Sequence, residues 1–354
     1  MSPRRRDGVD AAVRESTRLV RTDVVFMKTS TRPRESVARR HNEDNYFESI
    51  NYHHRGAPKQ WYGIPGSEAA RFEDVVRRFH KQRLLEVPDL LHRINLQISP
   101  AKLAALEVPI HRICQNPGEF VVTFPQAFHG GFSYGFNCGE AVNFATPDWV
   151  QHARLANEHY RTIARLGVVG HDRLMFTLAH NVDTYTDIAS CEALRGEVWR
   201  IAEEEARTRP HLYRTEGLRD VSDRVGPPPG NNTRVCGKDD ADFDDTRICC
   251  ICKHTCYASI VGCNCSNDQL VCLRHAGFLC RCPPSNRFVL EWEKVEDLIR
   301  LARRVDERTE GVLLLERGAS GHLRSRVRRA VDFPFVSRCL ASSCDAQCRS
   351  TGAR

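Results

Sequence analysis

The sequence predicts a mainly β unit, followed by a helical spacer and a small unit that folds around two zinc ions. Three observations support this prediction. Short apolar segments bounded by glycine and proline recur between residues 37 and 150, which is typical of strands. A helical spacing of apolar side chains replaces them from Trp149 to about Arg209. Nine of the 16 cysteines then fall between Cys249 and Cys282.

The whole chain limits the class of protein. Its 354 residues and 41% apolar content suggest two or three domains with at least one buried core. No apolar run reaches the ~18 to 20 residues that a bilayer span needs, and no signal peptide follows Arg4–Arg6. We therefore expect a soluble, intracellular protein without membrane contact.

Residues 1–36 are rich in arginine and lack a sustained apolar period. Eleven arginine or lysine residues against five acids occur in residues 1–40, so this segment holds most of the net charge of +7. We expect a disordered basic arm that contacts nucleic acid or acts as a nuclear import signal. A merely solvated tail would have the same composition.

The first candidate metal ligands are His41 and Glu43. Side chains two residues apart on an extended segment point to the same side, so one further histidine would complete a 2-His-1-carboxylate set that binds Fe(II). His-x-Glu alone is a weak pattern in a chain with 15 histidines. The flanking sequence strengthens it, because Ser49–Tyr52 alternates polar and apolar residues as a half-buried strand does.

A second strand is expected over Lys59–Pro65, after a turn at Gly56–Pro58. If the two strands form a hairpin, Lys59 returns beside the His-x-Glu strand, where its ammonium group could pair with the carboxylate of a metal-bound organic acid. Residues 66–113 then look helical, beginning with a helix from Glu68 to Leu85.

The candidate for the missing histidine is His129. A strand over Glu119–Phe124 ends at Pro125, and His129 precedes two glycines that allow close approach of another backbone. A core histidine bonded to a carbonyl group would have the same surroundings. A further strand is expected over Phe136–Phe144, next to the strand that carries the metal ligands.

The cysteine cluster contains eight potential ligands in four close pairs, which are Cys249 and Cys252, Cys263 and Cys265, Cys272 and His275, and Cys280 and Cys282. Such pairs suit two tetrahedral zinc sites, which are structural because four protein ligands leave no position for water. We favour an interleaved pairing, in which the first and third pairs share one ion and the second and fourth share the other. Sequential pairing is the alternative. Cys250 and Cys256 are surplus, and Cys250 could replace Cys249.

Changes in composition predict the boundaries between these units. The helical spacer is expected over residues 151–225, and a linker with three consecutive prolines and a run of aspartates over 226–246. The zinc unit then spans 247–285, a helix spans 286–310 and a tail spans 311–354.

The motifs of the β unit resemble those of a JmjC domain and occur in the same order. They are His-x-Glu-Asp from His41, Ser-Ile-Asn-Tyr from Ser49, Pro-Lys-x-Trp-Tyr-Gly-x-Pro from Pro58, Gly-Glu-Phe-Val-x-Thr-Phe-Pro-x-Ala-Phe-His-x-Gly-Phe from Gly118, and Gly-Phe-Asn-Cys-x-Glu-Ala-Val-Asn-Phe from Gly135. The resemblance implies a cupin-like double-stranded β-helix, or jelly roll, with His41, Glu43 and His129 as Fe(II) ligands. It also implies that Lys59, helped by Ser49 and Asn51, binds 2-oxoglutarate.

The segment before His41 departs from the JmjC pattern. Ala38 and Arg40 stand where the family usually has phenylalanine and tryptophan, and no strand is evident upstream. We therefore expect residues 37–150 to be the C-terminal portion of a JmjC domain that lacks its N-terminal part, with an incomplete jelly roll.

The order of five cysteines, one histidine and two cysteines resembles the C5HC2 zinc finger. After a JmjC domain and a helical spacer, this finger is similar to that of animal and plant demethylases of methylated lysine 4 of histone H3. The resemblance implies a nuclear enzyme that acts on the histone H3 tail of the nucleosome with Fe(II), 2-oxoglutarate and two zinc ions, and releases formaldehyde. The alternatives are a catalytically inactive chromatin-binding protein and an oxygenase of the same fold that acts on a non-histone side chain.

Overall fold

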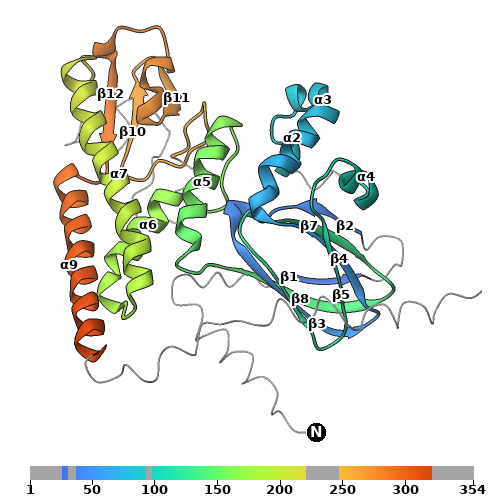
Figure 1. Cartoon of the computed structure of the whole chain (residues 1–354). Helices are drawn as coiled ribbons and strands as arrows, with labels where there is room; N and C mark the ends of the chain where they lie inside the picture. Colours follow the sequence, from blue (N-terminus) through green and yellow to red (C-terminus); the bar gives the residue numbers. More distant parts are fainter. Residues whose placement is uncertain (1–25, 31–36, 93–97, 221–246, 321–354) are drawn as a thin grey trace, which may run out of the picture.

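The computed structural model describes residues 26–30, 37–92, 98–220 and 247–320. Figure 1 shows two facing sheets on one side of the molecule, and a group of helices with a small third sheet on the other. Helix α5 (Trp149–Thr162) follows the last strand of the facing sheets and lies between the two parts.

The two facing sheets have four antiparallel strands each. One has the order β1-β8-β3-β6 and the other the order β2-β7-β4-β5. This is the arrangement of a jelly roll, which the cupin-like fold adopts, and the predicted β unit is confirmed. The strands are β1 (Phe26–Ser30), β2 (Val37–His41), β3 (Glu48–Gly56), β4 (Lys59–Ile64), β5 (His111–Gln115), β6 (Phe120–Thr123), β7 (Phe128–Ser133) and β8 (Asn137–Phe144).

The segment before His41 contains more structure than the sequence analysis expected. Residues 26–30 fall in the predicted disordered arm, yet they form β1, whose residues pair with Asn137–Ala141 of β8. Backbone hydrogen bonds hold such an edge strand, so a sequence without apolar alternation can still form it. The expectations of a disordered arm up to residue 36, and of no strand upstream of the segment that ends at His41, are therefore wrong for residues 26–30. The two facing sheets of the described residues together have eight strands.

β3 and β4 do not form the predicted hairpin. Gly56, with φ +106°, and Pro58 lead the chain from one sheet to the other, so β4 pairs with β5 and β7. β7 therefore lies between β4, which carries Lys59, and β2, which ends at His41. β8, predicted to lie next to the strand of the metal ligands, is instead in the opposite sheet. Local alternation predicts strands but not their partners, because pairing depends on residues far apart in the sequence.

Three short helices lie outside the second sheet, namely α2 (Ala69–Phe79), α3 (Lys81–Glu86) and α4 (Pro100–Ala105). The ring of Phe72 on α2 packs against that of Phe128 on β7, with centroids 4.6 Å apart. Because side chains alternate along a strand, Phe128 facing α2 directs its neighbour His129 to the inside of the jelly roll. The helix predicted from Glu68 to Leu85 is interrupted at His80, where φ is −125°.

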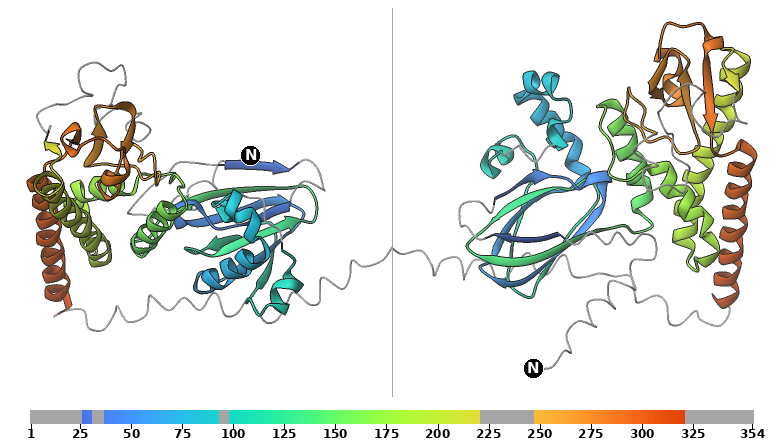
Figure 2. Two further views of the ribbon diagram at one scale, coloured as in Figure 1. Left: turned by 90° about the horizontal axis from the view of Figure 1, so that it is seen from above. Right: turned by 180° about the vertical axis from the view of Figure 1, so that it is seen from behind.

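The helical spacer is a second packed unit with its own core. Both views of Figure 2 place α9 on the side of the spacer that faces away from the jelly roll. The helices bury one apolar stripe each, with Phe176, Val198 and Ala302 fully enclosed. None of the described helices has the length and apolar content to cross a bilayer. Besides α5, the helices are α6 (His171–His180), α7 (Ile188–Arg214) and α9 (Val295–Ser320).

The third sheet belongs to the cysteine-rich unit and has the order β11-β10-β12-β9. β9, at the end of the spacer, pairs in parallel with β12, so the two units share a sheet. The predicted helix over residues 286–310 is instead β12 followed by α9, which also includes residues 311–320 of the predicted tail. The predicted linker over 226–246 lies outside the described residues. The strands are β9 (Arg219–Asp220), β10 (Ser259–Cys263), β11 (Ser266–Val271) and β12 (Arg287–Glu291).

Candidate metal centres

Three groups of potential metal ligands come together in the described residues, and the ligand atoms of each group lie within 4.8 Å of one another. Two of the groups have four members, and these are the same residues that the predicted interleaved pairing assigns to the two zinc ions. The groups are His41, Glu43 and His129 (the jelly-roll group), Cys249, Cys252, Cys272 and His275 (the first cysteine group), and Cys263, Cys265, Cys280 and Cys282 (the second cysteine group).

The jelly-roll group forms because β2 and β7 pair in register at His41 and His129. The two ring centroids lie 4.6 Å apart. Glu43 follows β2, and its Oε1 lies 3.2 Å from Nε2 of His129. Two ligand atoms bound at right angles, each about 2.1 Å from one ion, would be about 3 Å apart, so this spacing fits a shared metal ion. Two imidazoles and one carboxylate are the donor set of non-haem Fe(II) sites.

The main chain fixes the ring of His129. Its Nδ1 lies 3.0 Å from the carbonyl oxygen of Ala127, which can only accept a hydrogen bond, so Nδ1 carries the proton and donates it. Nε2 is then the ring atom that faces Glu43, either as a donor to the carboxylate or, without its proton, as a metal ligand. A metal-binding histidine usually has an orienting partner of this kind.

The carboxyl group of Glu43 is ionised at neutral pH. Burial raises its pKa, but the hydrogen bond and charge of His129 and a hydrogen bond from Asn143 outweigh this effect and lower the pKa to about 2. Asn143 on β8 reaches Glu43 from the opposite sheet. The strand predicted over Phe136–Phe144 contains Asn143, but no local pattern indicates that this strand lies in the sheet opposite the metal ligands.

Lys59 lies in the same sheet as His129 but further along it. On β4, Gly63 pairs with His129 and Lys59 pairs with Ser133, so Lys59 is four residues, or about 13 Å, along the strand. Its Nζ lies 3.9 Å from the ring centroid of Trp61, whose ring is 6.2 Å from that of His129. The ammonium group therefore turns back toward the jelly-roll group, although β3 and β4 form no hairpin.

Ser49 and Asn51 lie on β3, in the sheet opposite Lys59. The hydroxyl of Ser49 is buried and lies 2.6 Å from the hydroxyl of Thr123 on β6. The main-chain carbonyl of Asn51 accepts a hydrogen bond from Gln115 of the facing sheet. The hydrogen bond from Gln115 on β5 to Asn51 on β3 thus connects the two sheets.

The first cysteine group has the dimensions of a tetrahedral zinc site. The Sγ atoms of Cys252 and Cys272 are 3.8 Å apart. Nδ1 of His275 lies 3.6 Å from Sγ of Cys249 and 3.2 Å from Sγ of Cys272. Sulfur atoms about 2.3 Å from a central zinc are about 3.8 Å apart in a tetrahedron, so these residues fit a zinc ion.

The second cysteine group surrounds the turn between β10 and β11. Cys263 ends β10, and Cys280 and Cys282 follow the 3-10 helix η5 (Leu273–Phe278). The guanidinium of Arg287 on β12 donates to the carbonyl oxygens of Cys280 and Cys282, at 2.7 and 3.2 Å. β12 therefore holds the second ligand pair in place, which the sequence analysis missed because it expected a helix there.

Cys250 and Cys256 lie outside both cysteine groups, and Cys249 belongs to the first one. Cys250 is exposed. Cys256 is buried, and this burial raises the pKa of its thiol well above the usual range, so the thiol stays protonated.

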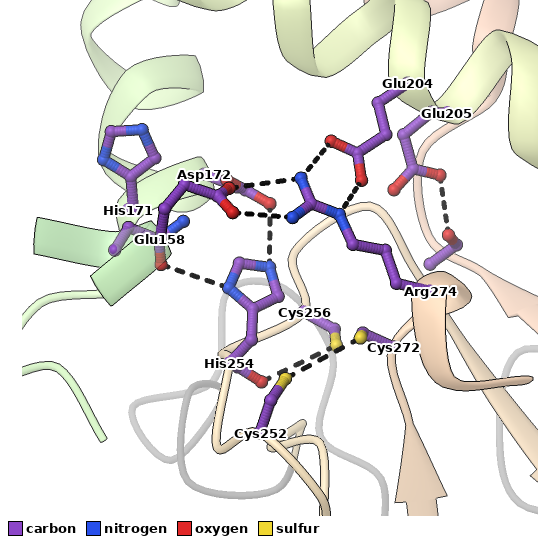
Figure 3. A network of polar contacts seen from close by, with 12 residues as sticks. Glu158, His171, Asp172, Glu204, Glu205, Cys252, His254, Cys256, Cys272 and Arg274 are labelled. Atoms are coloured by element: carbon purple, nitrogen blue, oxygen red, sulfur yellow. Dashed lines mark hydrogen bonds and ion pairs between the residues drawn. The ribbon is translucent and has the colours of Figure 1, made fainter. Parts of the chain in front are cut away.

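The loops that carry the first cysteine group also contact the spacer (Figure 3). His254 lies in one loop, and its Nε2 is 3.1 Å from Oδ2 of Asp172 on α6. Arg274 lies in η5, between Cys272 and His275, and donates to Glu158 of α5 at 2.7 Å and to Glu204 of α7 at 2.5 Å. The cysteine-rich unit, called the finger below, is thus joined to the spacer by ionic contacts that the sequence pattern did not reveal.

Comparison with known families finds two matches. Residues 29–144 match the JmjC domain, described as a hydroxylase, and residues 249–301 match the C5HC2 zinc finger. The first match begins at β1, and the second extends into α9, beyond the end predicted for the zinc unit.

Several relatives cover most of this chain. Putative lysine-specific demethylase JMJ16 of Arabidopsis thaliana is 36% identical over 277 residues, which are 77% of this chain and 23% of that protein. Lysine-specific demethylase 5B of Gallus gallus is 39% identical over 243 residues, 69% of this chain and 15% of that protein. Lysine-specific demethylase 5D of Homo sapiens is 35% identical over 273 residues, 76% of this chain and 17% of that protein. The chain thus spans less than a quarter of the length of these curated relatives.

Proposed function

Because the chain contains a JmjC domain and a C5HC2 zinc finger, we propose that it is an Fe(II)- and 2-oxoglutarate-dependent histone lysine demethylase. The observation that carries this proposal is the ligand set of His41, Glu43 and His129 inside a jelly roll. The similarity to proteins named as lysine-specific demethylases supports the choice of a methylated lysine as substrate.

In the proposed reaction, His41, Glu43 and His129 would hold Fe(II), which would supply the activation of dioxygen for hydroxylation of an N-methyl group. One oxygen atom enters the methyl group and the other enters 2-oxoglutarate, which becomes succinate and carbon dioxide. The hydroxymethyl group leaves as formaldehyde. Because a C–H bond is attacked, the amine needs no lone pair, and trimethyl-lysine is an allowed substrate.

The protein side chains have separate roles in this scheme. The proton on Nδ1 of His129, held by the carbonyl of Ala127, leaves Nε2 free to bind the metal. The hydrogen bond from Asn143 orients the carboxylate of Glu43. We assign Lys59 to the distal carboxylate of 2-oxoglutarate, since a charge-assisted pair in a half-buried position is strong and directional.

Ser49 and Asn51 complete the proposed co-substrate site from the opposite sheet. Ser49 has a buried hydroxyl, and Asn51 lies two residues further on the same face of β3, in the sheet opposite Lys59. A bound dicarboxylate would thus be enclosed between the two sheets.

We assign the substrate to methylated lysine 4 of histone H3, and the protein to the nucleus. The support is the zinc finger, with two proposed zinc ions, placed after the JmjC domain and the helical spacer. The finger contacts the spacer through Asp172 and Glu204, so it lies in a fixed position relative to α5 to α7.

Turnover by the purified chain tests this function. Succinate and formaldehyde are measured with histone H3 peptides that carry trimethyl-lysine at position 4 or at position 9. We expect equal amounts of both products from the first peptide, none with His129→Ala, and full activity with His211→Ala, which changes an exposed histidine on α7. Equal turnover of both peptides would refute the assignment to lysine 4 but would leave the proposed demethylase activity standing.

The absence of any turnover, in a protein that retains two zinc ions, would contradict the enzymatic proposal. It would favour the catalytically inactive chromatin-binding protein. The observation behind that alternative is the presence of Ala38 and Arg40 where JmjC domains usually have aromatic residues.

A further inference from the structure

The ligand Glu43 belongs to no helix or strand of its own. β2 ends at His41, and the 3-10 helix η1 (Asp44–Tyr46) begins after Glu43. The carbonyl oxygen of Glu43 accepts a hydrogen bond from the main-chain N–H of Tyr46, at 3.0 Å. The position of Glu43 therefore depends on the tight turn that follows it.

This turn has an unusual backbone. Asn45 and Tyr46 both have positive φ angles, +50° and +53°. Asparagine tolerates this conformation, but a bulky aromatic residue rarely adopts it, so surrounding contacts must hold the turn. Asn45, Tyr46 and Phe47 are all buried, with 3 to 5% of their surface exposed.

Helix α5 binds both the main-chain N–H and the main-chain carbonyl of Asn45. Its N–H donates to Oη of Tyr160 at 2.9 Å, and its carbonyl oxygen accepts from Nε1 of Trp149 at 3.2 Å. Trp149 also stacks on Phe47, with ring centroids 4.4 Å apart and planes within 6°. Both ends of α5 thus contact the turn that follows Glu43.

The side chain of Asn45 is held as well. Its Oδ1 accepts from the main-chain N–H groups of Val168 and Val169, at 3.0 and 3.4 Å, and its Nδ2 donates to the carbonyl of Val169. A Cβ atom at Gly167 would lie 3.2 Å from this Nδ2, so the glycine allows the close approach. The amide therefore binds the segment between α5 and α6 at three points.

We propose that Asn45 is a positioning residue for the metal ion of the jelly-roll group, which it serves by fastening the Glu43 turn to α5 and to residues 167–169. The inference rests on the proposed function, because it takes Glu43 to be a ligand of a metal ion. It assigns α5 a role beyond packing, as the support against which one of the three ligands is held.

The test is the dissociation constant of Mn(II), measured by electron paramagnetic resonance on the full chain without oxygen or substrate. Mn(II) is the weakest competitor of its series for thiolate sites, so it leaves the zinc ions in place. Asn45→Gly keeps a residue that tolerates positive φ but removes the three side-chain contacts. We expect this variant to bind Mn(II) about 10-fold more weakly, as after the loss of an outer contact at a metal site.

Tyr160→Phe provides a second variant, which leaves the N–H of Asn45 without its acceptor and should weaken Mn(II) binding in the same way. Asn181→Ala removes an exposed amide at the end of α6 and is the matched control, with unchanged affinity. Zinc content should stay at two ions in all variants, which separates local repositioning from unfolding.

Mn(II) affinities within twofold of the wild-type value in both variants would overturn this inference and leave the proposed function standing. A wild-type protein whose Mn(II) binding does not depend on His129 would overturn both. A loss of affinity that merely follows a loss of zinc or of folded protein would show a general structural role and would also overturn the positioning role.

Discussion

The buried charge of Glu197 depends on its partners in the spacer. Its side chain is 5% exposed, and its Oε1 lies 2.7 Å from Nε2 of His171. Arg200 donates to the same oxygen at 2.6 Å. Burial raises the pKa of Glu197, but the hydrogen bonds from His171 and Arg200 prevail and hold the pKa below its usual value of 4.5. The ionised carboxylate therefore stabilises the folded chain.

A pH dependence follows from the lowered pKa. A carboxyl group with a lower pKa in the folded state contributes its full stability above the unfolded pKa, and loses it as pH falls through the folded pKa. We expect Glu197→Gln to lower the free energy of unfolding by about 1 to 2 kcal/mol at pH 6, and by less and less below pH 4.5. Urea titrations at several pH values measure this difference, with the exposed Glu203→Gln as control. A difference that does not change with pH would contradict the assignment.

The residues of the jelly-roll group could be predicted from the sequence, but the groups that orient them could not. His41, Glu43 and His129 stand in recognisable motifs, and the structure brings them together. The carbonyl of Ala127 and the amide of Asn143 carry no local signal, because their roles arise only when β7 and β8 lie on opposite sides of the same interior.

At the scale of elements, β7 and β4 approach each other closely beside the jelly-roll group. A Cβ atom at Gly131 would lie 1.9 Å from the carbonyl oxygen of Gln60, whereas one at Gly63 would meet no atom within 4 Å. The two strands pair along their whole length, so any displacement at Gly131 also moves His129.

These two glycines allow a matched comparison. We expect Gly131→Ala to cost about 2 to 3 kcal/mol of stability, as overpacking of a core does. It should also weaken metal binding, because His129 is two residues away. Gly63→Ala on the partner strand should change stability by less than about 0.5 kcal/mol. Thermal and urea unfolding measure the stabilities, and equal effects of both substitutions would contradict the close packing of β7 on β4.

The cysteine groups make a prediction about zinc stoichiometry. Cys252 and Cys272 are 3.8 Å apart in the first cysteine group. The double variant with Cys252→Ser and Cys272→Ser should therefore lose one zinc ion and keep the other. Under sequential pairing it would remove a ligand from each site. Native mass spectrometry counts the ions, and a protein without zinc would contradict the interleaved pairing.

The control for that experiment is Cys250→Ser, which changes an exposed cysteine outside both groups and should retain two zinc ions. Hydrogen exchange gives a second readout. Loss of the first site should raise exchange in β10 and β11, since zinc provides much of the folding energy of so small a sheet.

Most elements could be predicted from the sequence, whereas their pairing could not. The strands that contain Ser49, Lys59 and Val121 follow from alternation and from the flanking glycines and prolines. The sequence does not predict β1, β5, β7 or β12, because each depends on a partner strand far away in the sequence. The same dependence explains why β4 leaves β3 and joins the opposite sheet.

At the scale of the whole molecule, three units follow each other along the chain and contact each other through α5. The jelly roll contacts α5 through Asn45, and the finger contacts it through Arg274. The spacer helices α5 to α7 lie between the jelly roll and α9 (Figure 2). Composition predicted the three units, but no periodic pattern marks the side chains and strands through which they contact each other.

The central claim is that His41, Glu43 and His129 form an iron site that also binds 2-oxoglutarate. The most direct test is an anaerobic titration of the purified chain with Fe(II) and 2-oxoglutarate, followed by visible absorption. A chelated 2-oxo acid on Fe(II) gives a charge-transfer band, which should appear with one iron per chain, disappear in His129→Ala and require more 2-oxoglutarate in Lys59→Ala. A protein that keeps two zinc ions but shows no such band would contradict the account.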